Sequence, residues 1–434
     1  MKVPERPRWS TKTGFVFASM GCAVGLANIW MFPWRVGQFG GAAFLIPYFI
    51  FLLVIGIIGL TIEWGLGRSQ DGGPQRAFAG AGFPAGKWWG ILPYIGAVLI
   101  LAFYANIIGW SLKFLLGTIT GAALAGEPGQ FFGSVAFQPE AIMWFCITIV
   151  LTVLIVACGV KKGIEMSARV MMPLLFVLIT AMAIWSVTLP GALEGLKFYL
   201  IPDLSKLTGE VWLIALSQSI FTLSLGGGAM VVYGSYLRKS EDITTAAISV
   251  GFGNAVIAIM AGFVIFPAIF AFGLSPEAGP GLAFITIPLL LQSMPGGAVW
   301  GVMFFVSLFF AGITSTVAIM EVVTDGVIDN LHWDRKWAAI CVGAIAMALG
   351  IPASINPGYF DTIITISTVW GLPICGLIAA LAFLWSYGAK KAREHVNMGS
   401  SITLGKWWEP WAKYIYPLVI IVVLVIGIVL GISG

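Results

Sequence analysis

Long apolar runs separated by short polar stretches recur along the whole chain. A hydrocarbon core of about 30 Å needs roughly 20 helical residues to cross it, and eleven segments are long and apolar enough to do so. They lie at about 13–36, 40–68, 88–117, 140–159, 165–187, 211–237, 242–273, 297–328, 336–352, 359–387 and 413–432. The pattern therefore predicts an all-α polytopic membrane protein with eleven spans.

Composition agrees with this prediction. Of the 434 residues, 59% are hydrophobic and only 10% are charged, against roughly 25% charged in an average soluble domain. The small net charge of +4 gives no support to nucleic-acid binding. The five cysteines lie inside apolar segments without a CxxC pair, which speaks against a disulfide framework or a zinc site. No span contains a histidine, and no HExxH or GxSxG motif occurs, so we do not expect an enzyme.

The distribution of Lys and Arg predicts the orientation. Basic residues gather in the tail 1–12 and in alternate loops, whereas the loops between them have few or none. Because cytoplasmic loops carry the excess of basic residues, we expect a cytoplasmic N-terminus and, with eleven spans, a C-terminus outside. The external connection 274–296 is partly apolar but contains four prolines. It is expected to form short helices packed into a vestibule.

Two spans contain glycine clusters that predict broken helices. Gly21 and Gly25 interrupt the first span, and Gly226, Gly227 and Gly228 interrupt the sixth. Glycine disfavours helix by about 1 kcal/mol per residue, and unwound backbone at membrane depth must line a cavity or be buried in protein. The alternative is that these glycines only allow close helix packing.

The breaks lie five spans apart, which is typical of an inverted 5+5 repeat in secondary transporters. The expected organisation is a cytoplasmic tail at 1–12, a first repeat at 13–187, a second repeat at 188–388, and a cytoplasmic loop with the eleventh span at 389–434. Free carbonyls at such breaks suit Na⁺ and ammonium groups, and half-helix N-termini suit a carboxylate.

Neutral oxygen donors inside the spans indicate a site for a monovalent cation. They are Asn28, Gln218, Thr222, Ser224, Asn254, Thr314, Ser315 and Thr316. Each one alone is more typical of contacts between helices. Glu63 is the clearest acidic residue in an apolar segment, and we expect it to cap backbone N–H groups at the break in the sixth span.

Four long motifs resemble the neurotransmitter–sodium symporter family, and in particular its bacterial amino-acid members of the LeuT type. They are GCAVGLANIWMFPWRVGQFGGAAFLIPY, IEWGLGR, FTLSLGGGAMVVYGSY and FFAGITSTVAIME. The resemblance covers nearly the whole chain. It implies a LeuT-type fold with two Na⁺ sites.

By this resemblance, each Na⁺ site has its own set of ligands. The first set is the Ala23 carbonyl, Asn28, Thr222, Asn254 and the substrate carboxylate. The second set is the carbonyls of Gly21, Val24 and Ala311 with the hydroxyls of Thr314 and Ser315. A carboxylate that completes a sodium site makes the binding of ion and substrate mutually favourable.

The resemblance also implies a substrate site and an inner gate. The substrate carboxylate would meet Tyr104 and the N–H groups of Leu26 and Ala27. The ammonium would meet the carbonyls of Ala23, Phe221 and Thr222 and the hydroxyl of Ser224. The side-chain pocket would consist of Ile100, Phe221, Gly227, Ser315 and Ile319, with Tyr104 and Phe221 as the outer lid. The inner gate would consist of Arg6, Trp9, Tyr236 and Asp329.

Several positions depart from the family pattern. Met31 replaces the outer-gate arginine and Ile364 its aspartate partner, so we expect an apolar outer gate, with Arg35 and Asp361 as nearby alternatives. Gly227 replaces a residue that is often large. An enlarged pocket predicts a bulky apolar or aromatic L-amino acid.

The anion position is also unusual. The family surrounds chloride with residues that match Tyr48, Gln218, Thr222 and Asn254 together with a serine, or replaces the chloride with a glutamate. Ala258 occupies that last position and supplies neither a serine nor a glutamate, so the sequence leaves chloride dependence open. Gly163 and Pro173 match a Gly-x₉-Pro spacing at which related transporters unwind, although a simple kink explains it equally well.

Other classes of membrane protein fit less well. An ion channel needs a filter repeat, which is absent, and the short tails make an amino-acid sensor a weak alternative. A proton-coupled transporter on the same fold stays an alternative. We expect a multi-pass protein of the cell inner (plasma) membrane, as a monomer or a weak homodimer.

Overall fold

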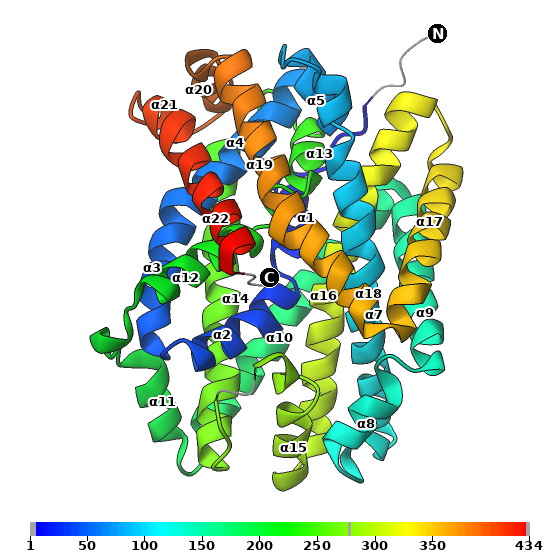
Figure 1. Cartoon of the computed structure of the whole chain (residues 1–434), viewed down its shortest axis with the longest axis vertical. Helices are drawn as coiled ribbons and strands as arrows, with labels where there is room; N and C mark the ends of the chain where they lie inside the picture. The colour runs from blue at the N-terminus through cyan, green and yellow to red at the C-terminus, as the bar shows by residue number, and fades with distance from the viewer. Residues whose placement is uncertain (1–5, 277–278, 431–434) are drawn as a thin grey trace.

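A computed structural model describes residues 6–276 and 279–430 of the chain. Nine helices in this part are long and apolar enough to cross a membrane, and a bent helix pair at residues 12–38 makes a tenth. The sixth predicted span, 211–237, is divided into two short helices and completes the eleven. The prediction of an all-α membrane protein is thus confirmed. Most of the long helices run side by side along the long axis of the molecule (Figure 1).

The helices that form the predicted first repeat are bounded as follows. They are α1 (Lys12–Ala23), α2 (Phe32–Gln38), α3 (Ala42–Phe51), α4 (Ile57–Gln70), α7 (Leu92–Ile119), α9 (Pro139–Ala157) and α10 (Met166–Val187). Short helices connect them: α5 (Pro74–Gly80), α6 (Gly86–Trp89) and α8 (Pro128–Val135). A π-helical turn at Leu52–Gly56 joins α3 and α4 into one span, and π-helical turns at Ala27–Met31 and Val160–Glu165 lead directly into α2 and α10.

The second half of the chain has its own set of helices. They are α11 (Ala192–Leu200), α12 (Gly209–Phe221), α13 (Ala229–Ser235), α14 (Ile243–Ala271), α15 (Thr286–Ser293), α16 (Gly297–Leu331), α17 (Arg335–Ile355), α18 (Pro357–Ile364) and α19 (Leu372–Leu381). The basic loop, which is predicted to be cytoplasmic, and the last span follow as α20 (Ala389–Asn397), α21 (Trp408–Pro410) and α22 (Tyr416–Leu430). π-Helical turns lie at Thr365–Gly371, Ala382–Ser386 and Trp411–Ile415, and 3₁₀ turns at Ala122–Leu124, Leu204–Lys206 and Gly279–Leu282.

Both predicted breaks are present. Helix α1 ends at Ala23, and the chain becomes helical again at Ala27 after a bend of 52°. Helix α12 ends at Phe221, and α13 begins only at Ala229. Gly226 and Gly228 have φ values of 84° and 78°, in the left-handed region that glycine adopts most easily. A Cβ on Gly226 would also lie 2.0 Å from the Leu372 carbonyl oxygen, so this glycine is required by both conformation and space.

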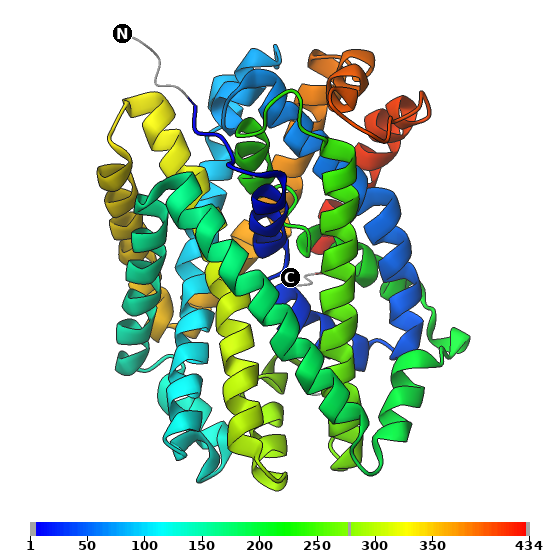
Figure 2. The same ribbon diagram turned by 180° about the vertical axis from the view of Figure 1, so that it is seen from behind.

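The broken helices lie inside a shell of continuous ones. Helix α1 packs against α10, α14 and α16, and α10 crosses the rear of the molecule obliquely (Figure 2). Apolar side chains on the outer surface of this shell are exposed, among them Val170, Val177 and Ile184 on α10. A large exposed apolar surface is expected where lipid is the solvent.

The connections separate into two ends. Helices α5 and α20 lie at one end of the molecule, and α8 and α15 lie at the other (Figure 1). The basic loops at 68–87 and 389–406 therefore share one end, as the charge pattern requires. In the predicted external connection, α15 buries Ile287, Leu290 and Leu291, which confirms a short packed helix there.

The boundaries of the fifth span differ from the prediction. The span begins at Val160 rather than at 165, because the chain winds into a π-helical turn that includes Gly163. Pro173 lies inside the continuous helix α10. The Gly-x₉-Pro segment is therefore helical in this conformation, and its unwinding stays a prediction.

Candidate functional site

A cavity of about 50 Å³ lies at the two helix breaks. Nine residues expected at the substrate site line it: Ala23, Ala27, Ile100, Tyr104, Phe221, Ser224, Gly227, Ser315 and Ile319. Four others were not predicted: Cys22, Gly25, Ala229 and Leu372. Cys22 and Gly25 lie within the first glycine-rich break, which could have indicated them. Leu372 lies on the tenth span and carries no local signal.

The hydroxyl of Tyr104 closes one end of this cavity. It accepts a hydrogen bond of 2.9 Å from the backbone N–H of Leu26. A Cβ on Gly25 would lie 2.5 Å from the same hydroxyl oxygen and 2.7 Å from Ser315 Oγ. The absence of a side chain at residue 25 thus lets the break approach α7 and α16 closely.

The proposed first sodium site is a buried cluster of neutral oxygens. Asn254 Oδ1 accepts hydrogen bonds from Asn28 Nδ2 at 2.9 Å and from Thr222 Oγ1 at 3.2 Å. Thr222 Oγ1 also lies 3.2 Å from Asn28 Oδ1. All three side chains are fully buried. Because a divalent ion prefers carboxylates, this uncharged cluster suits a monovalent cation.

The proposed second site joins α1 to α16. Ser315 Oγ lies 3.2 Å from the carbonyl oxygens of both Gly21 and Ala311, and Thr314 Oγ1 lies 3.1 Å from that of Ala311. A Cβ on Gly21 would lie 2.9 Å from the Thr314 Cβ, so glycine is needed for the helices to approach. Val24 is also fully buried beside this contact, at the C-cap of α1. Hydroxyls that donate to carbonyls keep lone pairs free for a cation.

Glu63 supports the second break, as the sequence predicted. Its Oε1 accepts a hydrogen bond of 2.6 Å from the backbone N–H of Gly226. The side chain is almost fully buried on α4. The carboxylate therefore satisfies one donor of the unwound segment 222–228, where a helix can no longer do so.

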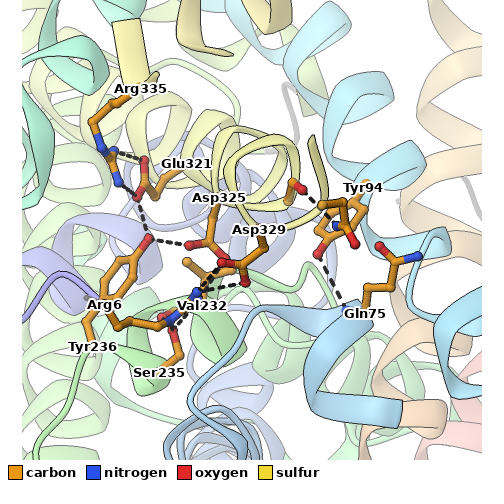
Figure 3. Close-up of polar contacts among 12 residues, drawn as sticks. Arg6, Gln75, Tyr94, Val232, Ser235, Tyr236, Glu321, Asp325, Asp329 and Arg335 are labelled. Carbon is orange, nitrogen blue, oxygen red and sulfur yellow. Dashed lines mark hydrogen bonds and ion pairs between the residues drawn. The ribbon is translucent and has the colours of Figure 1, made fainter. Parts of the chain in front are cut away.

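The expected inner gate is closed by an ion-pair network (Figure 3). Arg6 donates to Asp329 Oδ2 at 2.7 Å and Asp325 Oδ2 at 2.9 Å, and its guanidinium lies 5.3 Å from the centre of the Tyr236 ring. Burial works against the charge of Arg6, yet the two carboxylates raise the pKa of the guanidinium above its usual value. Trp9 Nε1 donates to the Tyr233 carbonyl at 3.0 Å and fills the gap beside the network.

This network is larger than the sequence indicated. The Tyr236 hydroxyl donates toward Glu321 Oε1 at 2.5 Å and Asp325 Oδ1 at 2.9 Å, and Arg335 binds Glu321 through two nitrogens at 2.7 and 2.9 Å. Glu321, Asp325 and Asp329 recur every four residues on α16 and so share one helix face. That spacing was a signal for the acidic residues, whereas nothing local indicated Arg335.

An apolar vestibule of about 230 Å³ lies on the other side of the substrate cavity. Met31 and Ile364 both line it, together with aromatic side chains such as Trp110 and Phe360. Phe221 lines the vestibule and the substrate cavity and thus separates them. The two positions of the missing ion pair therefore face one apolar space.

Arg35 and Asp361 do not replace that ion pair in this conformation. Arg35 Nη1 donates to Gln218 Oε1 at 2.7 Å, and Asp361 is exposed. Gln218 Nε2 in turn donates to the Ala27 carbonyl at 2.9 Å. At the family's anion position, Tyr48 lies 3.4 Å from Asn254 Nδ2, and Ala258 is buried.

Comparisons with known proteins give a consistent result. The Sodium:neurotransmitter symporter family matches residues 6–126 and 132–431. An uncharacterized sodium-dependent transporter of Methanocaldococcus jannaschii is 34% identical over 97% of this chain and 90% of its own. The sodium-dependent transporter YhdH of Bacillus subtilis is 34% identical over 96% of both chains. The crystal structure of MhsT in complex with L-phenylalanine superposes with a TM-score of 0.87 at 39% identity, covering 97% of this chain and 99% of that one.

Proposed function

Because this chain belongs to the sodium:neurotransmitter symporter family, we propose that it couples the Na⁺ gradient to the uptake of bulky hydrophobic or aromatic L-amino acids. The observation that carries this proposal is the cavity at the two helix breaks, with a neutral oxygen cluster beside each break. Alternating access around this cavity moves the substrate across the membrane.

The walls of the cavity support the substrate class. Ile100, Ile319 and Leu372 form apolar sides, and a Cβ placed on Gly227 would have no neighbour closer than 3.5 Å. Space next to Gly227 suits a large side chain. The relative MhsT binds L-phenylalanine, which agrees with the proposed class of large apolar substrates.

Two Na⁺ sites would stabilise the closed arrangement of the breaks. The first joins Asn28 on the first span to Thr222 on the sixth and Asn254 on the seventh. The second joins Gly21 to Ser315 on α16. An ion shared between helices that move apart during transport favours the closed form. The substrate carboxylate, bound next to the first ion, makes its affinity depend on Na⁺.

The remaining assignments follow the charge pattern and the repeat. The protein lies in the cell inner (plasma) membrane. Its N-terminus is cytoplasmic and its C-terminus is outside, because α5 and α20, next to the basic loops, lie at one end of the molecule. Residues 13–187 and 188–388 form the inverted repeats, with the tail 1–12 and the segment 389–434 outside them. The protein acts as a monomer or a weak homodimer.

Uptake into proteoliposomes tests the function directly. We expect saturable accumulation of L-phenylalanine, L-tryptophan or L-leucine when external Na⁺ is high, and loss of accumulation when choline replaces Na⁺. Accumulation driven by a proton gradient in choline would favour the proton-coupled alternative. Single-channel currents without saturation by amino acid would favour a channel. Uptake of glycine but not of the large amino acids would contradict the proposed substrate class.

A further inference from the structure

Arg35 on α2 is a buried cation without an anionic partner among the described residues. Only 2% of its surface is exposed, and no described carboxylate forms an ion pair with it. Its guanidinium makes one hydrogen bond, from Nη1 to Gln218, and lies 5.5 Å from the centre of the Trp34 ring. Nε is enclosed and has no hydrogen-bond partner in the described part of the chain. A buried charge left this incomplete is costly.

Arg68 shows what a satisfied buried arginine looks like in the same protein. It is 1% exposed and also has no carboxylate partner within residues 6–276 and 279–430. All three of its nitrogens nevertheless donate hydrogen bonds, and they do so to His395 Nε2 and to the carbonyls of Glu241, His395, Val396 and Met398. Backbone acceptors thus replace a counter-ion at Arg68, and they are missing at Arg35.

A cavity of about 60 Å³ adjoins Arg35 between α12, α19 and α22. A site for one water molecule needs roughly 10–15 Å³ of such space, so a small ion fits. The Ser217 hydroxyl lines the cavity and donates to no described acceptor. Thr368 also lines the cavity, and Ile214, Val369 and other apolar side chains form most of the remaining wall. Such a wall excludes water and strengthens the attraction between a cation and an anion.

We propose that this cavity binds a small monovalent anion of halide size, held by the Arg35 guanidinium and the Ser217 hydroxyl. The donors that now lack acceptors are those that an anion would satisfy. The site differs from the family's anion position, since none of Tyr48, Thr222 and Asn254 lines this cavity.

The amino-acid substrate is a second source of the same chemistry. Phe221 and Thr368 line both this cavity and the outer vestibule, so the two spaces adjoin, and a rearrangement of these side chains would let a carboxylate from the vestibule reach Arg35. A halide and a carboxylate both accept from a guanidinium, and the experiment must separate them.

The anion would act on transport through Gln218. This side chain links Arg35 to the Ala27 carbonyl at the first helix break, through contacts of 2.7 and 2.9 Å. A bound anion neutralises the charge of Arg35 and so changes the strength of its hydrogen bond to Gln218. Because Gln218 also binds the Ala27 carbonyl, this change reaches the backbone beside the substrate carboxylate. Only this effect rests on the proposed function; anion binding itself does not.

Thermal unfolding of the purified full-length protein in detergent tests the site, with Na⁺ constant and no amino acid present. Replacing gluconate with increasing bromide should raise the unfolding midpoint of the wild type to a plateau. Arg35→Met keeps much of the length of the side chain but removes its charge. In this variant, half-saturation should need about ten- to a hundredfold more bromide. Arg35→Lys should retain much of the response, and Ser217→Ala should weaken it. An equal bromide response in wild type and Arg35→Met would overturn the proposal.

Two further measurements show which site and which anion produce the bromide response. Tyr48→Phe should leave it unchanged, and loss of the response there would place the anion at the family position instead. If bromide has no effect on the wild type while Arg35→Met weakens the binding of L-phenylalanine in gluconate, the partner is a carboxylate and the halide assignment is wrong. Failure of Na⁺-driven uptake would leave the bromide result untouched, so the two proposals fail independently.

Discussion

Glycines at the site serve opposite purposes. Gly25 is needed because its neighbours, Tyr104 and Ser315, leave no room for a Cβ. Gly227 has room on its cavity side, where the nearest atoms to a built Cβ lie 3.5 Å away on Leu372 and Ser224. The first glycine therefore permits helix contact, whereas the second sets the size of the space for the substrate side chain.

Filling that space should change the preferred substrate. In Gly227→Phe the new ring occupies a cavity of only about 50 Å³. Overpacking costs about 1–3 kcal/mol, so the affinity for L-phenylalanine should fall by roughly tenfold or more, while L-alanine is less affected. Gly227→Ala is the matched control and should bind both nearly as the parent does. Competition binding with radiolabelled amino acid measures this, and unchanged phenylalanine affinity in Gly227→Phe would place the substrate elsewhere.

At the scale of helices, the beginning of the fifth span makes hydrogen bonds to the segment just before the first span. Glu165 ends the π-helical turn Val160–Glu165 and is 1% exposed. Its carboxylate accepts from the backbone N–H of Ser10 at 2.9 Å and from the Ser10 hydroxyl at 2.5 Å. A Cβ on Gly14 would collide with it. The helical state of this turn therefore holds the N-terminal end of α1 against α10.

Loosening this contact should favour opening toward the cytoplasm. Glu165→Gln removes the charge from hydrogen bonds that contribute about 1.5–3 kcal/mol when one partner is ionised. Amide hydrogen exchange should then increase in residues 10–20 and 158–166. Glu194→Gln is the control, because Glu194 is exposed and pairs only with Lys197 among the described residues. Equal exchange in both variants would show that Glu165 does not hold α1.

Local sequence predicted these elements only in part. Glycine clusters indicated both breaks, because the cost of glycine in a helix is a local property. The beginning of the fifth span was placed five residues late, because Lys161 and Lys162 looked like a loop. In the structure the turn that carries them is wound against Ser10 and Thr11 through Glu165. Ser10 and Glu165 are 155 residues apart in the chain, so the residue pattern of either segment does not show that they are in contact.

At the scale of the whole molecule, different chemistry closes the two sides of the central cavity. Charged residues close the side that we propose to face the cytoplasm, where Arg6 connects the N-terminal tail to α16 through Asp325 and Asp329. Apolar and aromatic side chains, among them Met31 and Ile364, line the outer side. Opening the inner side must break ion pairs, whereas opening the outer side exposes apolar surface.

Removing one charge from the Arg6 ion-pair network should reduce transport without reducing substrate binding. In Asp329→Asn, Arg6 keeps Asp325 but loses a charged partner, and the closed inner side should lose roughly 1–3 kcal/mol. Uptake into proteoliposomes should fall, while Cys22 becomes more reactive toward thiol reagents from the cytoplasmic side. Asp361→Asn changes an exposed aspartate on α18, outside the ion-pair network; it is the control and should behave like the parent. Slower reaction of Cys22 in Asp329→Asn would contradict this role.

The sequence by itself determined the spans, the two breaks and the family, because hydropathy, glycine content and long motifs are properties of local segments. It also brought forward the neutral oxygens, which are polar residues inside apolar spans, and the family resemblance supplied the core of the inner gate. Only the tertiary structure decided what meets across the chain: Arg335 with Glu321, Leu372 with the substrate cavity, and Arg35 with Gln218 rather than Asp361. Partners this far apart are chosen by how the helices pack. No pattern within one segment specifies that packing.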